Sequence, residues 1–389
     1  MLSLTRRIDP DDKSPLETEY SRRTGHKITV IVALLIIVVL FAAYSLTFNG
    51  RGMDFAEVCG TILDRITGTE YEPFSPEWYD SNMIWNLYVP RVYLGVFLGA
   101  GLAICGVAMQ SVMSNPLADS YTTGISDGAC FGAVAAIVTG FALSDLTGSM
   151  GIVTNAFLGG LVPAVILIVL SNIIRMSPAT MILVGVALSY IFSGMESAIM
   201  VGTDADTLKE AYLWQIGTLG DIVSWDQCYL PIGVTVAGSL IIWALSNRLN
   251  LLTLGDDSAK SLGLNVRMFK TIVMIIISLL VASLVSYVGI VGFVGLVAPH
   301  IVRMIMGNNA TYLIPASALV GSLLILLADL ISRTIIAPDE LRLGVIISMI
   351  GAPIFLYIIL SRKKSYGEVF RWQEDSRRAT PASIVARSS

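Results

Sequence analysis

Long apolar segments alternate with short polar connections along the chain. An α-helix rises about 1.5 Å per residue, so roughly 20 apolar residues cross the hydrocarbon core of a bilayer. A folded soluble protein does not carry a succession of such segments. The pattern therefore predicts an all-α polytopic membrane protein of about ten transmembrane helices. The segments with few or no charges cover roughly 28–48, 89–113, 121–144, 150–174, 178–202, 227–246, 271–291, 293–306, 312–331 and 343–360.

The eighth segment is the least regular of the set. Residues 271–302 contain no charge, which is too long for one helix and short for two full ones. Gly289, Gly292 and Gly295 interrupt this stretch, and Pro299 follows. Broken or short helices are common where a transporter lines a cavity. A re-entrant eighth segment would leave nine crossings instead of ten.

The distribution of charge favours ten crossings. With ten, most of the 25 basic residues lie on the side of the two chain ends, and the acidic loops 49–86 and 203–226 lie on the other side. Nine would place Arg362 and its two neighbouring lysines outside, against the positive-inside rule. We therefore expect a cell-membrane protein with both termini in the cytoplasm. Its parts are an N-terminal tail (1–27), a membrane domain (28–361) and a C-terminal tail (362–389).

Composition and motifs narrow the function classes. The chain is 54% hydrophobic and 14% charged, against about 25% charged residues in soluble proteins. The four cysteines and two histidines are scattered, so no metal site is expected. The sequence contains no GxxxxGK[ST], HExxH or GxSxG motif, so an enzyme is disfavoured. Powered transport would need a partner or an ion gradient.

Four ionisable residues lie inside the apolar segments: Asp127, Glu196, His300 and Asp329. Ion-coupled carriers usually keep several such groups at mid-membrane. Arg333 follows Asp329 by four residues, which places both on one helix face and favours a structural ion pair over a proton relay. His300, beside Pro299, favours a packing role over a ligand role.

The loop 247–270 is the most informative polar segment. Asp256, Asp257 or Ser258 can cap a short helix that Gly263 ends. An apolar face would come from Leu254, Ala259 and Leu262. The residues alone leave two interpretations open, a solvated loop with one amphipathic turn or a docking helix for a cytoplasmic protein.

Six stretches together resemble one known family, over about residues 84–361. The chain is similar to the permease subunits of FecCD-type (type II) ABC importers, which take up iron-siderophores, haem and cobalamin. The matching stretches, in order, are GAGLAICGVAMQSVMSNPLADSYTTGIS (99–126), ILVGVALS (182–189), YLWQIGTLGDIVSW (212–225), LGDDSAKSLGLNV (254–266), GIVGFVGLVAPHIVRM (289–304), and ADLISR with APDELRLGVIISMIGAPIFLYIIL (328–333 and 337–360).

The resemblance implies an assembly around this chain. A second permease subunit, either a copy or a paralogue, would complete a central pore, and each subunit would have ten helices. Two cytoplasmic ABC ATPase subunits would bind ATP and Mg²⁺, and this chain would bind no cofactor itself. An extracytoplasmic substrate-binding protein would deliver the cargo. The coupling helix to the ATPase would lie within 254–266, on Gly255, Asp256, Ala259, Leu262 and Gly263.

The resemblance also implies a pathway and a gate. The fifth helix (about 180–201) and the tenth (about 344–360) would line the pathway, with Ser189, Ser193 and Glu196 on the fifth. The cytoplasmic gate would consist of Asn115, Pro116, Leu117, Ser177, Pro178, Ala179 and Thr180.

Glu196 departs from the family pattern, which has an apolar or small residue there. An ionised acid at mid-membrane costs roughly 2.5–3.5 kcal/mol, so it should face water or a partner. One hypothesis is that it disfavours anionic cargo. The alternative, a hydrogen bond to a neighbouring helix, has equal weight.

A second departure concerns docking of the binding protein. The family has W-x-x-R-L-P-R before its second helix, and this chain has Trp85 to Arg91 with Tyr88 in place of the first arginine. Arg91 is kept, and Arg333 matches the other docking position. We expect electrostatic docking to be weaker, or shifted to Arg51 or Arg342.

The leading interpretation is an importer subunit for a metal chelate, with a ferric siderophore first among the cargoes. Haem or cobalamin is the alternative within the class, because the motifs belong to scaffold and coupling rather than to cargo recognition. The alternative from another class is an ion-coupled secondary transporter that works alone.

Overall fold

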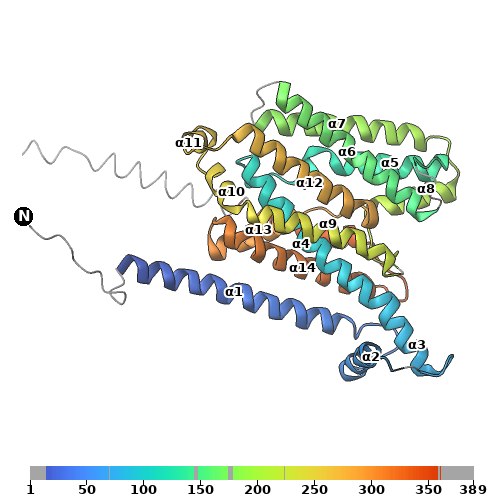
Figure 1. The fold of residues 1–389 in the computed structure, drawn as a ribbon. Coiled ribbons are helices and arrows are strands. Elements are labelled where there is room, and N and C mark those ends of the chain that lie inside the picture. The colour runs from blue at the N-terminus through green and yellow to red at the C-terminus, as the bar shows by residue number, and fades with distance from the viewer. Residues whose placement is uncertain are drawn as a thin grey trace, which may run out of the picture.

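The computed structural model describes residues 15–360, apart from 70, 144–147, 174–177, 223 and 358–359. Every regular element within those residues is a helix. Figure 1 shows the longer helices running side by side as a bundle, with short helices gathered at its two ends.

The described helices reproduce the predicted membrane segments one for one. Three apolar helices are short: α5 (Ile125–Thr139), α13 (Val294–Met306) and the helix Leu343–Tyr357. The multi-pass all-α prediction is therefore confirmed. The 7 helices that are long and apolar enough to cross a membrane are α1 (Pro15–Ser45), α4 (Val89–Val112), α6 (Ser149–Ile173), α7 (Pro178–Met200), α9 (Asp226–Ala244), α12 (Val266–Val288) and α14 (Ala310–Thr334).

Short helices close the two ends of the bundle (Figure 1). At one end lie α2 (Phe55–Thr67), α3 (Pro76–Met83) and α8 (Ala205–Ile216). At the other lie α10 (Ser246–Leu252) and α11 (Asp256–Ser261). A five-residue π-helix, η1 (Ile84–Tyr88), joins α3 to α4, and a 3-10 turn, η2 (Ser120–Thr123), precedes α5. The ends thus separate the acidic loops from the basic ones, as the charge pattern predicted.

The irregular eighth segment is a break between two helices. α12 ends before Gly289, whose φ of 79° is a conformation that favours glycine. Phe293 has a φ of 64° and directly precedes the short α13. Between them the backbone N–H of Val291 donates to the Tyr121 hydroxyl at 3.0 Å. His300 is buried within α13, as expected of a packing residue.

Glycine pairs let the helix backbones touch. A Cβ at Gly99 would collide with the backbone of Gly321 on α14, and one at Gly321 would collide with Gly99. Gly128 of α5 meets α6 in the same way, and Gly106 of α4 meets the carbonyl of Gly295 on α13. Small residues are needed here because lipid gives no hydrophobic drive for helix association.

The first helix begins earlier than the sequence pattern predicted. α1 starts at Pro15, so the second half of the predicted N-terminal tail continues the first membrane helix. An ion pair between Arg23 and Glu19, four residues apart with N···O 2.6 Å, supports this polar extension. The predicted C-terminal tail, 362–389, lies outside the described residues.

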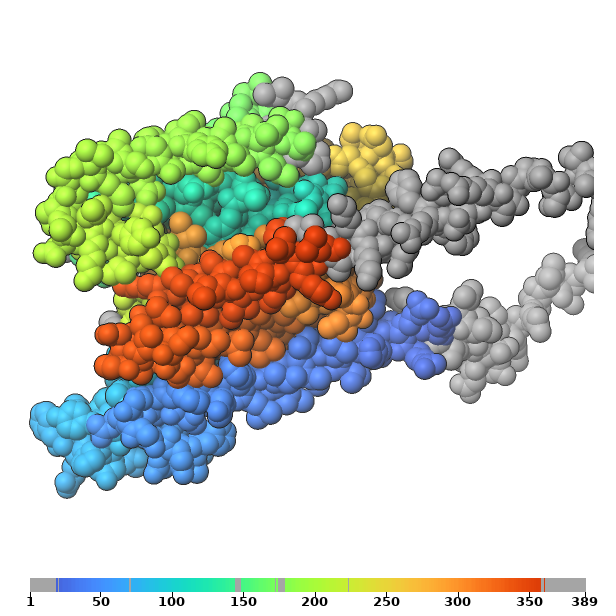
Figure 2. All heavy atoms as spheres, turned by 180° about the vertical axis from the view of Figure 1, so that it is seen from behind, coloured from blue at the N-terminus to red at the C-terminus, as the bar shows by residue number. Residues whose placement is uncertain are grey.

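Two edges of the bundle carry exposed apolar side chains. Figure 2 shows α1 and α2 along one edge, α7 along the opposite edge, and the helix Leu343–Tyr357 on the face between them. Leu183, Tyr190 and Ile191 of α7 are mostly exposed, as are Leu35 and Leu40 of α1. Exposed apolar patches of this size are surfaces for lipid or for another subunit.

Gly106→Ala should destabilise the chain by about 1–3 kcal/mol, because the new methyl group cannot displace the Gly295 backbone. The matched control is Gly233→Ala on α9, where a Cβ meets no atom within 4 Å. That substitution should be neutral, or stabilising by up to about 1 kcal/mol. Denaturant unfolding of the full chain in detergent measures both, and equal effects would contradict the backbone-contact interpretation.

Candidate functional site

The predicted coupling residues form one compact unit at the basic end of the bundle. Gly255, with φ 93°, precedes α11, and Gly263, with φ 88°, follows it. Ala259 is fully buried at the centre. The backbone N–H of Ala259 donates to Gly255 O at 2.9 Å, and that of Leu264 donates to Ala259 O at 3.1 Å. The glycines therefore reverse the chain on both sides of a rigid helical turn.

The expected cap and apolar face are only partly right. The residue at the N-cap is Gly255, which has no side chain, instead of one of the three polar residues that follow it. Ala259 faces inward, whereas Leu254 and Leu262 are 59% and 60% exposed. The two leucines thus form an apolar knob that projects from the bundle end.

An ion pair ties this unit to a membrane helix. Lys270, in the first turns of α12, donates to an Asp256 carboxylate oxygen at 2.8 Å. Its side chain is 15% exposed. The pair lines a cavity of about 430 Å³ with Lys260 and Arg267. A displacement of α11 is therefore transmitted to α12 as a rigid-body movement.

The predicted gate residues fall on two connections. Asn115, Pro116 and Leu117 follow α4, where the Asn115 side chain accepts from the Leu117 N–H at 3.0 Å. Ala179 and Thr180 lie in the exposed first turn of α7, which begins at Pro178, whereas Ser177 lies outside the described residues.

The connection after α4 then packs against α7. A Cβ at Gly185 would collide with the Thr122 carbonyl of η2, so the two backbones are in contact. Asp119 precedes η2, and burial raises the pKa of its carboxyl to about 6 although Ser120 donates to it. Movement of this connection must therefore move α7 as well.

Two of the three predicted pathway residues bond to α5. Ser189 donates to Asp127 Oδ2 at 2.6 Å, and Glu196 accepts a hydrogen bond from the Cys130 thiol. Both are half-buried, and Ser193 between them is exposed. The contact to a neighbouring helix, one of the two expectations for Glu196, is therefore present. Within the described residues, no three His, Cys, Asp or Glu side chains are grouped so that they could hold a metal ion.

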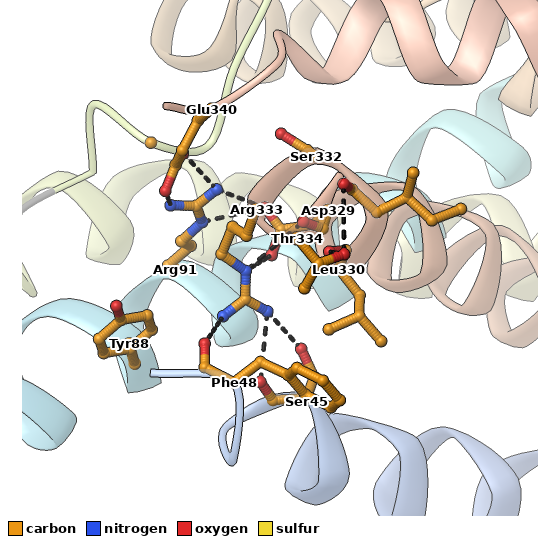
Figure 3. A network of polar contacts seen from close by, with 12 residues as sticks. Ser45, Phe48, Tyr88, Arg91, Asp329, Leu330, Ser332, Arg333, Thr334 and Glu340 are labelled. Atoms are coloured by element: carbon orange, nitrogen blue, oxygen red, sulfur yellow. Dashed lines mark hydrogen bonds and ion pairs between the residues drawn. The ribbon is translucent and has the colours of Figure 1, made fainter. Parts of the chain in front are cut away.

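A buried ion-pair network occupies the acidic end of the bundle (Figure 3). The Arg91 guanidinium donates to Asp329 Oδ1 at 2.9 Å and to both Glu340 oxygens at 2.9 Å each. Arg333 Nε lies 3.1 Å from Asp329 Oδ2. The pairing of Asp329 with Arg333 that the spacing predicted is thus confirmed, and it extends to a third and a fourth residue.

Arg333 also fastens the end of α1 to the bundle. Its guanidinium donates to Ser45 Oγ at 2.6 Å and to Phe48 O at 3.1 Å, and it lies over the Tyr88 ring (Figure 3). The Tyr88 hydroxyl donates to Asn49 O at 3.0 Å. The tyrosine that replaces the family arginine therefore has a structural role here.

These contacts change the picture of docking. Arg91 and Arg333 are 6% and 8% exposed and are already paired within the chain, so neither presents a free charge at the surface. Their docking role stays a prediction, and it now requires a partner carboxylate to displace Glu340. Arg51 and Arg342 are more accessible, and each pairs with one carboxylate, on Asp80 and Asp221.

Three participants were not expected from the sequence. Lys270, Cys130 and Glu340 are distant in sequence from their partners, by 14, 66 and 249 residues respectively (Asp256, Glu196 and Arg91). No local pattern marks a lysine in a helix start or an acid in a loop as the counter-charge of a remote residue. Lys270 could have been suspected, because it follows the coupling stretch directly.

The sequence matches the FecCD transport family over residues 34–361, which is most of the chain. The chain belongs to the FecCD transport family. The match covers the coupling unit, the gate connections, the pathway helix and the arginine network together.

Relatives of known name agree with this FecCD assignment. An ABC transporter permease protein from Methanocaldococcus jannaschii is 36% identical, over 89% of this chain and 98% of its own. The hemin transport permease of Yersinia pestis is 32% identical, over 85% and 95%. The vitamin B12 import permease of Vibrio cholerae is 33% identical, over 80% and 92%.

A solved structure has the same fold as this FecCD chain. It is an inward-facing conformation of a metal-chelate type ABC transporter, 28% identical, with a TM-score of 0.73. The alignment covers 86% of this chain and 99% of the other. The described helices therefore follow the architecture of an ABC transporter permease.

Asp329→Asn should destabilise the chain by about 3–5 kcal/mol, because two buried guanidinium groups lose their shared counter-charge. The control is Asp221→Asn, which removes the partner of Arg342 from a carboxylate that is 69% exposed. That change should cost less than about 1 kcal/mol. Denaturant unfolding of both variants tests the network, and a small cost for both would show that it is not structural.

Proposed function

We propose that this chain is the permease subunit of an ATP-driven importer and forms the membrane pathway for a metal chelate, most specifically a ferric siderophore. The observation that carries the proposal is the FecCD match, which spans nearly the whole membrane domain. The relatives named for hemin and vitamin B12, and the solved metal-chelate type transporter, support a bulky metal complex as cargo. Haem or cobalamin is the alternative cargo.

The energy for transport comes from separate subunits. The sequence holds no phosphate-binding loop of the GxxxxGK[ST] kind, so ATP and Mg²⁺ are bound by two cytoplasmic ATPase subunits. Each ATPase receives the exposed knob of Leu254 and Leu262. The short helix between two glycine turns, with its salt bridge to Lys270, suits the transfer of a rigid push into α12.

A second permease subunit completes the pathway. The exposed apolar sides of α7 and of Leu343–Tyr357 provide the surface that the second subunit covers. Ser193, exposed beside Glu196, then faces the space between the subunits. Asn115 to Leu117 and Pro178 to Thr180 narrow its cytoplasmic end. The positive-inside pattern places both termini in the cytoplasm.

A substrate-binding protein delivers the cargo at the acidic end. Its carboxylates would meet Arg51 and Arg342, which are accessible there. A carboxylate that displaced Glu340 would reach Arg91 as well. Because the loops at this end are acidic, we expect docking to be weaker at high ionic strength only where these arginines take part.

Leu262→Asp should abolish co-purification of the ATPase subunits, because a charge would replace the apolar knob that they contact. Leu63→Asp is the matched control, since Leu63 is also 60% exposed but lies on α2 at the opposite end of the bundle. It should leave the complex intact. Loss of the ATPase from neither variant would argue against coupling through α11.

Uptake into proteoliposomes separates the importer from an ion-coupled carrier. With the ATPase and the binding protein present, uptake of the ferric siderophore should need ATP inside the coupled compartment. It should also stop when Leu262→Asp is used. Uptake by this chain alone, driven by a proton or sodium gradient without ATP, would overturn the importer proposal.

Glu196→Gln should raise the uptake of anionic chelates relative to neutral analogues, if the half-buried carboxylate repels negative cargo in the pathway. Uptake of a charged and a neutral analogue by the same proteoliposomes gives the ratio. Ser193→Ala, one turn away, should leave the ratio unchanged. An unaltered ratio in Glu196→Gln would leave only the hydrogen bond to Cys130 as the role of the acid.

A further inference from the structure

The start of α1 carries a row of polar and basic residues before its apolar run begins. Glu19, Arg22, Arg23, His26 and Lys27 follow one another at spacings of three and four, so they share one face of the helix. The charge-free run starts at the next residue. The basic row therefore lies at the level where the helix enters the membrane.

This face is turned toward the rest of the chain. Continued along the helix, the same face contains Val30, Ile31 and Leu34, which pack against the main apolar core. The other sides of α1 remain open, with Val32 49% and Leu35 50% exposed. The basic row thus lines a space between α1 and its neighbours, instead of facing outward.

That space is a cavity of about 740 Å³. One wall is the row of five residues on α1. The other is the turn between α13 and α14, residues 305–309. The volume lies within the range of small-molecule sites, about 300–1,000 Å³. It is wide enough for a phosphate with a polar substituent.

The charges in the cavity are unbalanced. Glu19 is its acidic lining residue, and it already pairs with Arg23. Among the described residues, no carboxylate pairs with Arg22 or Lys27. The Lys27 ammonium is held over the Tyr312 ring, 5.0 Å from its centre, which keeps it at the cavity edge. Two uncompensated cations, with His26 beside them, suit an anion.

The walls beside the charges are apolar and open toward lipid. Ile305 lines the cavity and is 57% exposed, and its neighbour Met304 is 70% exposed. Ile28 on α1 is 51% exposed. A basic pocket between membrane helices on the cytoplasmic side, flanked by exposed apolar side chains, combines the two requirements of a phospholipid: charge for its headgroup and a surface for its acyl chains.

We propose that this cavity binds the headgroup of an anionic phospholipid of the cytoplasmic leaflet. A free phosphate would use the charges but not the apolar walls. The ATPase is a less suitable occupant, because the start of α1 lies well away from α11 at the bundle end (Figure 1). The lipid would fasten the peripheral α1 to the turn between α13 and α14. The site does not depend on the transported cargo.

Native mass spectrometry of the full-length chain in mild detergent tests the proposal, with phosphatidylglycerol and phosphatidylcholine of identical acyl chains as probes. The wild-type chain should retain phosphatidylglycerol in preference. Arg22→Gln with Lys27→Gln should weaken that binding roughly tenfold or more, since each basic residue near an anionic surface contributes about fivefold. Binding of phosphatidylcholine should not change.

Two further variants and one competitor make the result decisive. Arg65→Gln with Arg248→Gln removes two exposed charges elsewhere and should keep the preference. Arg22→Lys with Lys27→Arg preserves the charge and should also keep it, which separates binding from a folding defect. Equal retention of the two lipids by the wild type would overturn the proposal. So would complete displacement of phosphatidylglycerol by millimolar inorganic phosphate, which would mark a free-anion site.

Discussion

In a bilayer an apolar side chain gains nothing by leaving lipid for another helix, so helices associate where backbones touch or polar groups pair. This bundle depends first on backbone contact. Gly99 with Gly321, and Gly106 with Gly295, bring α4 against α14 and α13 at distances that no side chain would allow. α4 is consequently the most buried of the long helices. The other helices, and the sites they carry, are arranged around it.

Polar contacts then give the two ends different properties. At the acidic end, Arg91, Asp329 and Arg333 join α4, α14 and the end of α1 in a buried network, where loss of one charge leaves others uncompensated. At the basic end, the coupling turn is held by Lys270 but projects two leucines outward. One end is thus locked internally, whereas the other presents an apolar contact for a partner.

Agreement between sequence and structure is best where physics acts locally. The membrane segments followed from hydropathy and charge, because crossing a hydrocarbon core requires a minimum apolar length. The pair Asp329 and Arg333 followed from helical periodicity. The start of α1 was placed too late, because the sequence shows where the apolar run begins but not how far the helix continues into polar residues.

By itself, the sequence determined the all-α class, the order of the spans and the family, since each depends on residues close together along the chain. The tertiary structure decided which remote groups meet. Arg91 reaches Glu340 across 249 residues, and Glu196 accepts from Cys130 on another helix. A docking arginine of the family pattern becomes a buried structural one for that reason. Charge and spacing name the groups that can pair, but only packing in three dimensions selects their partners.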